Sequence, residues 1–369
     1  MKNTTTASVI TNQGISRRAF LSGMAAAAAG LLALGVTGPQ RAFAADAASS
    51  VKDAKASAAK DGSAAAEVTK GTKDSIKVAL VQLVDNDAFA TMIKGFKAGM
   101  ADAGYVEGTN ATFDLKNAQG DTAALNSIAA DVKNADYDVI VPIATPAAQA
   151  VVNAGVKAPV VFISVTDPVA AGIMTSADKP DKGATGTSNV IPVDKIFELA
   201  EQLKTKDLNT FGLLYCTGET NAVATVKKAK AYLDGAGKKY KETTVANSSE
   251  VQQAAQQLAS QVDAIYIPVD STVQSAMPQV VDAATKAGIP VYGSDPVMVQ
   301  SGCVACISVS NDDQGRAAAE LAVQITNGKD VADVPLKTFD TFQPVANKKT
   351  AEALGITLPT DGSITIIEG

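Results

Sequence analysis

Residues 76–83 read IKVALVQL, a short apolar run rich in β-branched residues, and an apolar face at helical spacing follows it. That face consists of Phe89, Met92, Ile93, Phe96 and Met100, at positions i, i+3, i+4, i+7 and i+11, before Gly104. A buried strand followed directly by an amphipathic helix is the repeating unit of α/β folds. We therefore expect a strand over 76–83 and a helix that ends at Gly104.

The same alternation continues along the chain. Further strands are predicted at 112–115, 138–144 and 159–165, with one helix striped by Leu125, Ile128, Ala129 and Val132 and another that opens at Pro146. After residues 183–188 a second series is predicted, with helices at 193–204, 219–235, 249–260 and 271–287 and strands at 210–216, 242–246, 264–268, 290–293 and 305–309. The chain ends with three more predicted elements: a helix with Ala317, Leu321, Ala322 and Ile325, a short helix at 349–354 and a β-like run at 363–367. Near-continuous apolar runs such as DVIVPIA (138–144) are typical of parallel strands covered by helices on both faces. Two such series of strands and helices therefore predict two lobes, each with a parallel sheet.

The composition excludes several classes of protein. The 369 residues are 46% hydrophobic and 19% charged, which is too apolar for a mainly disordered chain. Lys and Arg number 32 against 38 Asp and Glu, so no basic excess favours a nucleic acid partner. The chain has no His, which excludes Ser-His-Asp and Cys-His catalytic pairs and imidazole metal ligands.

The N-terminus has the pattern of an export signal. Arg17 and Arg18 precede Phe20-Leu21, an Ala/Gly/Leu stretch follows, and Ala42-Phe43-Ala44 fits an A-x-A cleavage site. The paired arginines resemble the twin-arginine signal, which routes folded proteins across a membrane. We expect residues 1–44 to be a signal peptide and the protein to be exported, to a periplasm or the cell surface. An N-terminal transmembrane helix, or an uncleaved signal that acts as an anchor, is the alternative.

Residues 45–74 are mostly Ala, Ser, Lys and Asp. Such a segment buries too little surface to offset the entropy of ordering, so a disordered linker is predicted there. An exposed Ala/Lys helix is the alternative.

Small polar residues stand where the predicted strands end. They are Gln82, Thr145, Thr166, Asp167, Thr217, Asp270, Ser271, Ser294 and Asp295. In open α/β sheets, ligands bind beyond the carboxyl ends of the strands, where helix N-termini present free N–H groups. Thr145-Pro146, Asp167-Pro168 and Asp295-Pro296 also have the form of an N-cap followed by a proline at the first helical position. A residue at this edge can serve both roles.

A series of short motifs runs in unbroken order through residues 76–340. They include GYVEG (104–108), NAQGD (117–121), IATPAAQ (143–149), VTDP (165–168), GTS (186–188), GETN (218–221), NSSEVQQAA (247–255) and VDSTV (269–273). Together they are similar to ABC-transporter substrate-binding proteins of the tryptophan/tyrosine-binding type. The resemblance implies the type I periplasmic-binding fold, an α/β fold of two Rossmann-like lobes with parallel sheets joined by a hinge. We place lobe 1 at 76–188 plus 309–337 and lobe 2 at 189–308 plus 338–369.

The resemblance also implies a function. We expect a non-catalytic solute-binding protein without a cofactor, a monomer that captures a small ligand and delivers it to an ABC permease in the membrane. The ligand class implied is an amino acid, with an aromatic one as the narrower expectation. The alternatives are a ligand-sensing protein that feeds a receptor kinase and a hydrolase that uses spare Asp and Glu residues.

The predicted ligand site matches the chemistry of a zwitterion. Hydroxyls for the ligand carboxylate come from Thr145, Thr166, Thr187 and Ser188, and carboxylates for its ammonium from Asp167, Glu219, Asp270 and Asp295. Gln82, Ala147, Asn221 and Ser271 complete the predicted set, in which Thr145 and Asp270 are the strongest candidates. Phe89, Phe162 and Tyr215 are possible stacking partners for an aromatic ligand, although their apolar surroundings favour the core.

Cys303 and Cys306 have the CxxC spacing of redox and metal sites. A zinc site would need two more ligands, and only Cys216 remains, so no metal is expected. Buried thiols are favoured over a local disulfide.

Overall fold

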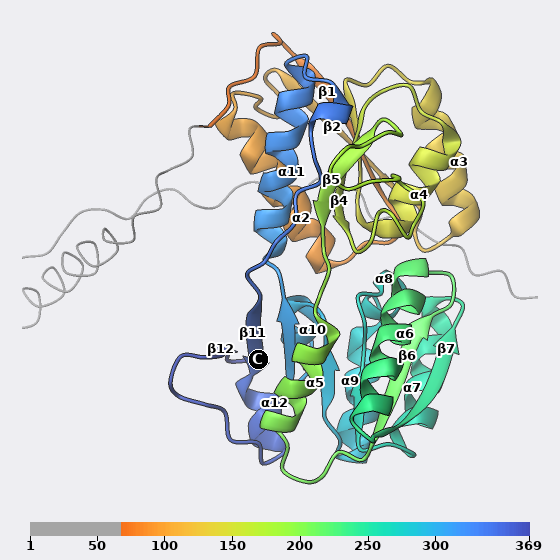
Figure 1. The fold of residues 1–369 in the computed structure, drawn as a ribbon, viewed down its shortest axis with the longest axis vertical. Helices are drawn as coiled ribbons and strands as arrows, with labels where there is room; N and C mark the ends of the chain where they lie inside the picture. Colours follow the sequence, from red (N-terminus) through yellow and green to blue (C-terminus); the bar gives the residue numbers. More distant parts are fainter. Residues whose placement is uncertain (1–67) are drawn as a thin grey trace, which may run out of the picture. The chain divides into compact units, whose positions relative to one another are not determined.

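The computed structural model describes residues 68–369, which form two α/β lobes, each built on one sheet (Figure 1). The sheet of the first lobe has the order β2-β1-β3-β4-β5, and all its strands are parallel. Its elements are β1 (Ile76–Gln82), α2 (Asp87–Asp102), β2 (Ala111–Asn117), α3 (Thr122–Asn134), β3 (Val139–Pro142), α4 (Ala144–Ala154), β4 (Val160–Val165), β5 (Ala184–Ser188), α11 (Asn311–Thr326) and the 3₁₀ turn η2 (Val331–Asp333).

The sheet of the second lobe has the order β12-β11-β10-β9-β8-β6-β7, in which only the β10–β11 pair is antiparallel. Its strands are β6 (Thr210–Cys216), β7 (Lys239–Val245), β8 (Ala264–Tyr266), β9 (Val291–Gly293), β10 (Ala305–Ser308), β11 (Gln343–Asn347) and β12 (Thr365–Ile367). Its helices are α5 (Val193–Gln202), α6 (Thr220–Gly235), η1 (Ser248–Glu250), α7 (Val251–Ala259), α8 (Ser271–Gln274), α9 (Met277–Ala287), α10 (Pro296–Gln300) and α12 (Lys348–Ala353). The chain therefore passes between the lobes three times, after β5, after β10 and after η2.

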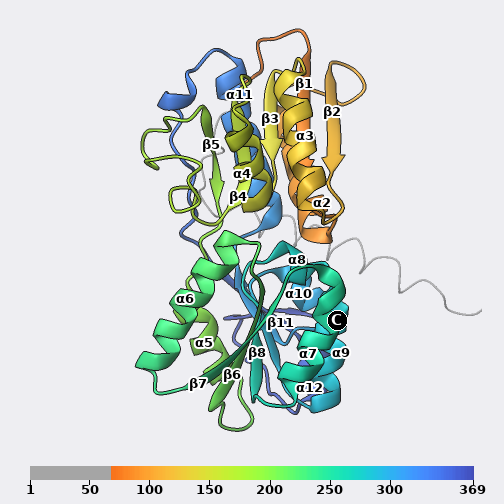
Figure 2. The same cartoon turned by 90° about the vertical axis from the view of Figure 1, so that its right-hand side faces the viewer.

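The central strands of both sheets are buried on their two faces, which explains the continuous apolar runs. Along β1, Val78 and Leu80 pack into one core cluster with α2 and α11, whereas Ala79 and Val81 pack into another with α3 and α4. Figure 2 shows α3 and α4 together on one face of this sheet. This arrangement confirms the predicted α/β class with mainly parallel sheets.

Helices α2 and α11 pack at backbone distance. A Cβ atom on Gly315 would lie 2.1 Å from the Met92 carbonyl oxygen, and one on Gly95 would lie 2.4 Å from the Asp312 carbonyl oxygen. A third glycine, Gly99, faces Ala319 in the same way, at 2.7 Å. Glycine is required here for close approach, and α11, which directly follows the second crossing, is thereby held firmly in the first lobe.

Four elements differ from the sequence predictions. The predicted helix 271–287 is broken into α8 and α9 at Ser275–Ala276, just ahead of Pro278, whose ring is incompatible with an unbroken helix interior. Residues 184–188, taken as a connection, form strand β5 beside β4. For α10 only the Asp295-Pro296 start was predicted and no range, because α10 is a single short turn of helix. Strand β11 (QPVAN) was not predicted, because it lacks an apolar pattern.

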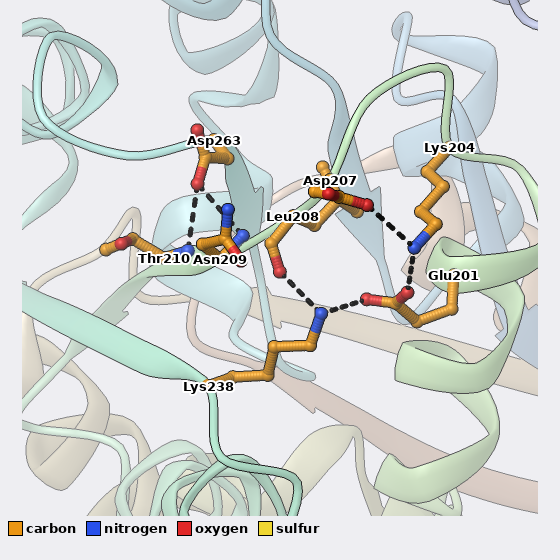
Figure 3. Close-up of polar contacts among 8 residues, drawn as sticks. All are labelled: Glu201, Lys204, Asp207, Leu208, Asn209, Thr210, Lys238 and Asp263. Atoms are coloured by element: carbon orange, nitrogen blue, oxygen red, sulfur yellow. Dashed lines mark hydrogen bonds and ion pairs between the residues drawn. The ribbon is translucent and has the colours of Figure 1, made fainter.

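Polar contacts fix the edge of the second sheet where its strands begin (Figure 3). Lys238, just before β7, donates to the Glu201 carboxylate of α5 (2.7 Å) and to the Leu208 carbonyl (2.8 Å). Asp263, just before β8, accepts hydrogen bonds from the N–H groups of Asn209 (3.0 Å) and Thr210 (2.9 Å). These contacts tie the loop between α5 and β6 to the starts of β7 and β8, the two strands that flank β6.

The described start of the chain is also tied down. Gly71 N–H donates to the Ala103 carbonyl at the end of α2, and Asn327 at the end of α11 accepts from Thr72 N–H. Lys73 forms an ion pair with Asp138. The last residues of the predicted linker (45–74) thus contact the first lobe, while the predicted signal peptide lies outside the described residues. Within residues 68–369, no helix has the length and apolar character needed to cross a bilayer.

Candidate functional site

Buried polar atoms without partners gather where the strands of both sheets end. They include Gln82 Oε1, Asn86 Nδ2, Thr145 Oγ1 and Thr166 Oγ1 in the first lobe and Asn221 Oδ1 and Gln274 Nε2 in the second, and further unpaired atoms are Asn189 Oδ1, Tyr292 OH and Gln314 Oε1. Gln82 ends β1, Thr145 follows β3 and Thr166 follows β4, and these three strands are neighbours in the sheet. An unpaired buried polar atom costs about 1–3 kcal/mol, so such a cluster is typical of a ligand site rather than of a core.

The start of α4 is the clearest anion-binding feature of the first lobe. Ala144 has a left-handed backbone (φ 65°), which turns the chain sharply from β3 into the helix. The residue before the helix, Ile143, gives no side-chain cap, and the Thr145 hydroxyl, 1% exposed, has no partner. The prediction that Thr145 is an N-cap is therefore wrong: Thr145 lies inside the first turn, where its hydroxyl and free N–H groups of the helix face the same edge. Ala147, also predicted, is fully buried in that turn.

In the second lobe, two carboxylates hold neighbouring strand ends together. Asp270 caps α8 through Val273 N–H (2.8 Å) and accepts a second bond from Cys216 N–H at the end of β6 (2.6 Å). Glu219, after β6, accepts from the N–H groups of Ser271 (3.0 Å) and Thr272 (2.8 Å). We call Glu219 and Asp270 the acid pair.

The acid pair is almost fully buried and lacks a cation. Asp270 is 0% and Glu219 2% exposed, and no ion pair within residues 68–369 involves either side chain. Burial, and next the charge of Glu219, raise the pKa of Asp270 well above its usual value. Burial likewise raises the pKa of the adjacent Cys216 thiol. The site is therefore set up to attract a positive charge.

A cavity of about 250 Å³ is lined by residues from both lobes. Its first-lobe wall contains Leu83, Gly120, Thr122, Leu125, Asn126, Pro146, Gln149, Ala150 and Asn153, and its second-lobe wall contains Cys216, Gly218, Glu219, Ala246 and Thr272. No Lys or Arg lines it, and the Glu219 carboxylate is the only acidic group in the wall. Thr220 Oγ1 donates to Gln149 Oε1 (3.2 Å), which joins the two walls.

The other predicted site residues already have partners within the protein. Thr187 Oγ1 accepts from Ser164 N–H (3.0 Å), and Ser188 Oγ donates to the Thr166 carbonyl (3.2 Å). Asp167 was predicted to cap a helix, but no helix follows it. Instead its carboxylate accepts from Ala170 N–H (2.9 Å) in a turn.

Two predicted residues join separate elements. Asp295 caps α10, as predicted, and accepts a hydrogen bond from Asn311 Nδ2 of α11 (3.0 Å), so it links the lobes beside the second crossing. Asn221 donates from Nδ2 to the Val269 carbonyl (2.7 Å), which leaves its Oδ1 free.

The aromatic and sulfur residues belong to the core. Phe89, Phe162 and Tyr215 are each at most 9% exposed and lie in apolar clusters. Cys303 and Cys306 are buried free thiols in the described chain. Residues 68–369 also contain no group of three or more His, Cys, Asp or Glu residues placed to hold a metal ion.

Sequence reasoning missed several residues of this edge. Asn86 caps α2 through Phe89 N–H (2.9 Å) and keeps its amide Nδ2 unpaired, and Gln274 ends the short α8. Asn126 and Asn153 line the cavity from helix faces. The position of Asn86, four residues beyond the end of β1, was a usable signal. For the other three, the facing partner is set only by the fold.

Comparison with known proteins identifies the family. A family model described as ABC transporter substrate binding protein matches residues 77–364, so the chain belongs to this family. A tyrosine-binding protein of Clostridioides difficile (strain R20291) is 35% identical over 296 residues, which are 80% of this chain and 86% of that protein.

Two solved structures are similar throughout their length. A conserved domain protein from Vibrio cholerae O1 biovar El Tor shares 35% identity over 80% of this chain and 99% of its own, with a TM-score of 0.76. An ABC domain from Streptococcus pneumonia in complex with L-Trp shares 32% identity over 79% of this chain and 100% of its own, with a TM-score of 0.75. The predicted resemblance and the type I periplasmic-binding fold are thus confirmed.

Proposed function

We propose that this protein captures an aromatic amino acid, L-tyrosine or L-tryptophan, outside the cytoplasm and delivers it to an ABC permease. The observation that carries this proposal is the cavity lined from both lobes, by Pro146 in the first turn of the uncapped helix α4 on one side and by Glu219 of the acid pair on the other. The names of the similar proteins, one tyrosine-binding and one bound to L-Trp, support the aromatic class.

The two charged ends of an amino acid match the two sides of the site. No Lys or Arg lines the cavity, so the carboxylate is bound at the start of α4, where the unpaired Thr145 hydroxyl immediately precedes Pro146 of the cavity wall. The ammonium is bound by the acid pair, which lacks a cation. The side chain contacts the apolar wall formed by Leu83, Leu125 and Pro146.

This role requires no reaction step. A ligand that contacts both lobes stabilises the arrangement in which both sets of contacts are made, and the permease recognises that arrangement. The protein then acts as a monomeric carrier without a cofactor, exported by the signal at residues 1–44.

Thermal unfolding of the full-length protein with each of the twenty amino acids tests the proposal. At a hundredfold excess over Kd, L-tyrosine or L-tryptophan should raise the free energy of unfolding by about 2.7 kcal/mol. The D-enantiomers and myo-inositol are the controls, since they present their polar groups in a different arrangement. Stabilisation by a sugar or polyol and by no aromatic amino acid would contradict the ligand assignment.

A further inference from the structure

The acid pair contains more buried negative charge than the described chain neutralises. Its two carboxylates come from adjacent loops, and each binds a backbone N–H next to the other: Glu219 binds Ser271 N–H, and Asp270 is the residue before Ser271. Two adjacent buried anions without a cation are strongly unfavourable, because desolvation and mutual repulsion add. The backbone N–H groups from which both carboxylates accept hydrogen bonds offset part of this cost, and a proton or a bound cation would remove the repulsion that is left.

The groups that face the acid pair offer no positive charge. From β6 comes the Cys216 thiol, whose own pKa is raised by burial, and α8 (Ser271–Gln274) contains no charged residue. The wall of the cavity that belongs to the first lobe contains only uncharged side chains, of which Gln149 accepts a hydrogen bond from Thr220 of the second lobe. Among the described residues, no group of three or more His, Cys, Asp or Glu side chains is placed to hold a metal ion at this site either.

We propose that the acid pair exchanges a proton for the ligand's ammonium group, so that ligand binding and proton release are coupled. This inference rests on the proposed function. In the ligand-free protein, the Asp270 carboxyl keeps a proton beside the Glu219 carboxylate, so the pair carries one negative charge. When the ammonium arrives at Glu219, which lines the cavity, the proton of Asp270 leaves to solvent, so charge and atoms balance.

The exchange gives the acid pair a role in selectivity. A ligand without an ammonium leaves the proton in place and gains no ion pair, so it is rejected by the loss of a charge-assisted contact. A proton in the medium competes with the ligand. The apparent affinity should therefore rise up to tenfold for each pH unit across the range in which the pair keeps its proton.

Two measurements on the full-length protein test the exchange. Infrared spectra of the ligand-free protein at pH 7 should show the C=O stretch of a protonated carboxyl, and L-tyrosine or L-tryptophan should remove it. Calorimetric titration with L-tryptophan in buffers of different ionisation enthalpy should show close to one proton released for each ligand bound. 3-(Indol-3-yl)propionate, which lacks the ammonium, should release none.

Variants separate the acid pair from other carboxylates. Asp270→Asn should abolish the carboxyl band and the proton release, because it removes the carboxyl that holds the proton, whereas Glu242→Gln, which removes a carboxylate bonded to Lys230 and Tyr215, should change neither. If Asp270→Asn does not fold, as checked by circular dichroism, the wild-type measurements decide. Absence of the carboxyl band in the ligand-free protein, or ligand binding without proton release, would overturn the exchange alone. If no amino acid binds, the proposed function fails and the exchange fails with it.

Discussion

Replacing Thr145 by Val should weaken ligand binding without weakening the fold. The two side chains have nearly the same shape, so the change removes only a hydroxyl that is 1% exposed and has no partner within the protein. Loss of a hydrogen bond to a charged carboxylate costs about 1.5–3 kcal/mol, which corresponds to a Kd raised roughly tenfold to a hundredfold. Because the hydroxyl is unpaired in the ligand-free protein, its removal should leave the free energy of unfolding unchanged or raise it by about 1 kcal/mol.

Thr185→Val is the matched control. The Thr185 hydroxyl is equally buried, but it donates to the Val334 carbonyl (2.8 Å). Its loss should lower the free energy of unfolding by about 1–3 kcal/mol and leave Kd for L-tryptophan unchanged. Calorimetry gives Kd, and urea unfolding gives stability. A Kd for Thr145→Val within twofold of wild type, in a protein that binds L-tryptophan, would refute the assignment of this hydroxyl to the ligand.

Three further predictions concern stability. Gly315→Ala should lower the free energy of unfolding by about 1–3 kcal/mol, since the new Cβ meets the Met92 carbonyl. The control Gly235→Ala, with open space around its Cβ, should be neutral or stabilising by up to about 1 kcal/mol. An equal response of both variants in urea unfolding would contradict the close packing of α2 and α11. Burial raises the pKa of Asp295 to about 6, so the free energy of unfolding of the wild type should fall as pH rises from 4 to 7.5. Asp295→Asn should remove up to about 3 kcal/mol of that fall. Parallel pH profiles of stability for the two proteins would count against this role of Asp295. Asp263→Ala should cost about 1–2 kcal/mol in urea unfolding through its lost bonds to two backbone N–H groups, with ligand affinity intact; a changed affinity would show that the loop between α5 and β6 reaches the site.

The sequence was most informative where one strong physical preference acts alone. The run at 76–83 becomes β1 because its side chains are buried on both faces of a sheet, and alternate residues enter different core clusters. The helix that contains Phe89 and Phe96 follows from the same burial on one face. Residues 184–188 were missed because ATGTS has little apolar character, and its strand exists only through pairing with β4.

From the sequence, the site could be located only to the edge of each sheet at which the strands end. Thr145 and Thr187 look alike in the sequence, yet one hydroxyl is free and the other accepts a hydrogen bond from Ser164 N–H. That difference depends on the left-handed backbone at Ser164 (φ 63°), which a non-glycine residue rarely adopts and which its sequence neighbours do not indicate. Asp270 was expected to be an available carboxylate. Its bonds to two N–H groups show that a charged residue at a strand end can also hold the backbone together.

The contacts of residues 71–73 have a practical consequence for anyone who immobilises or labels this protein. They fasten the chain to the ends of α2 and α11, at the edge of the first sheet where the strands begin, while Gln82 and Thr145 stand at the edge where strands end. A surface linker or reporter attached ahead of Lys70 would therefore act on the edge of the sheet that lies opposite the candidate site. Sensors built on this scaffold are best anchored there, with the dye placed on the second lobe.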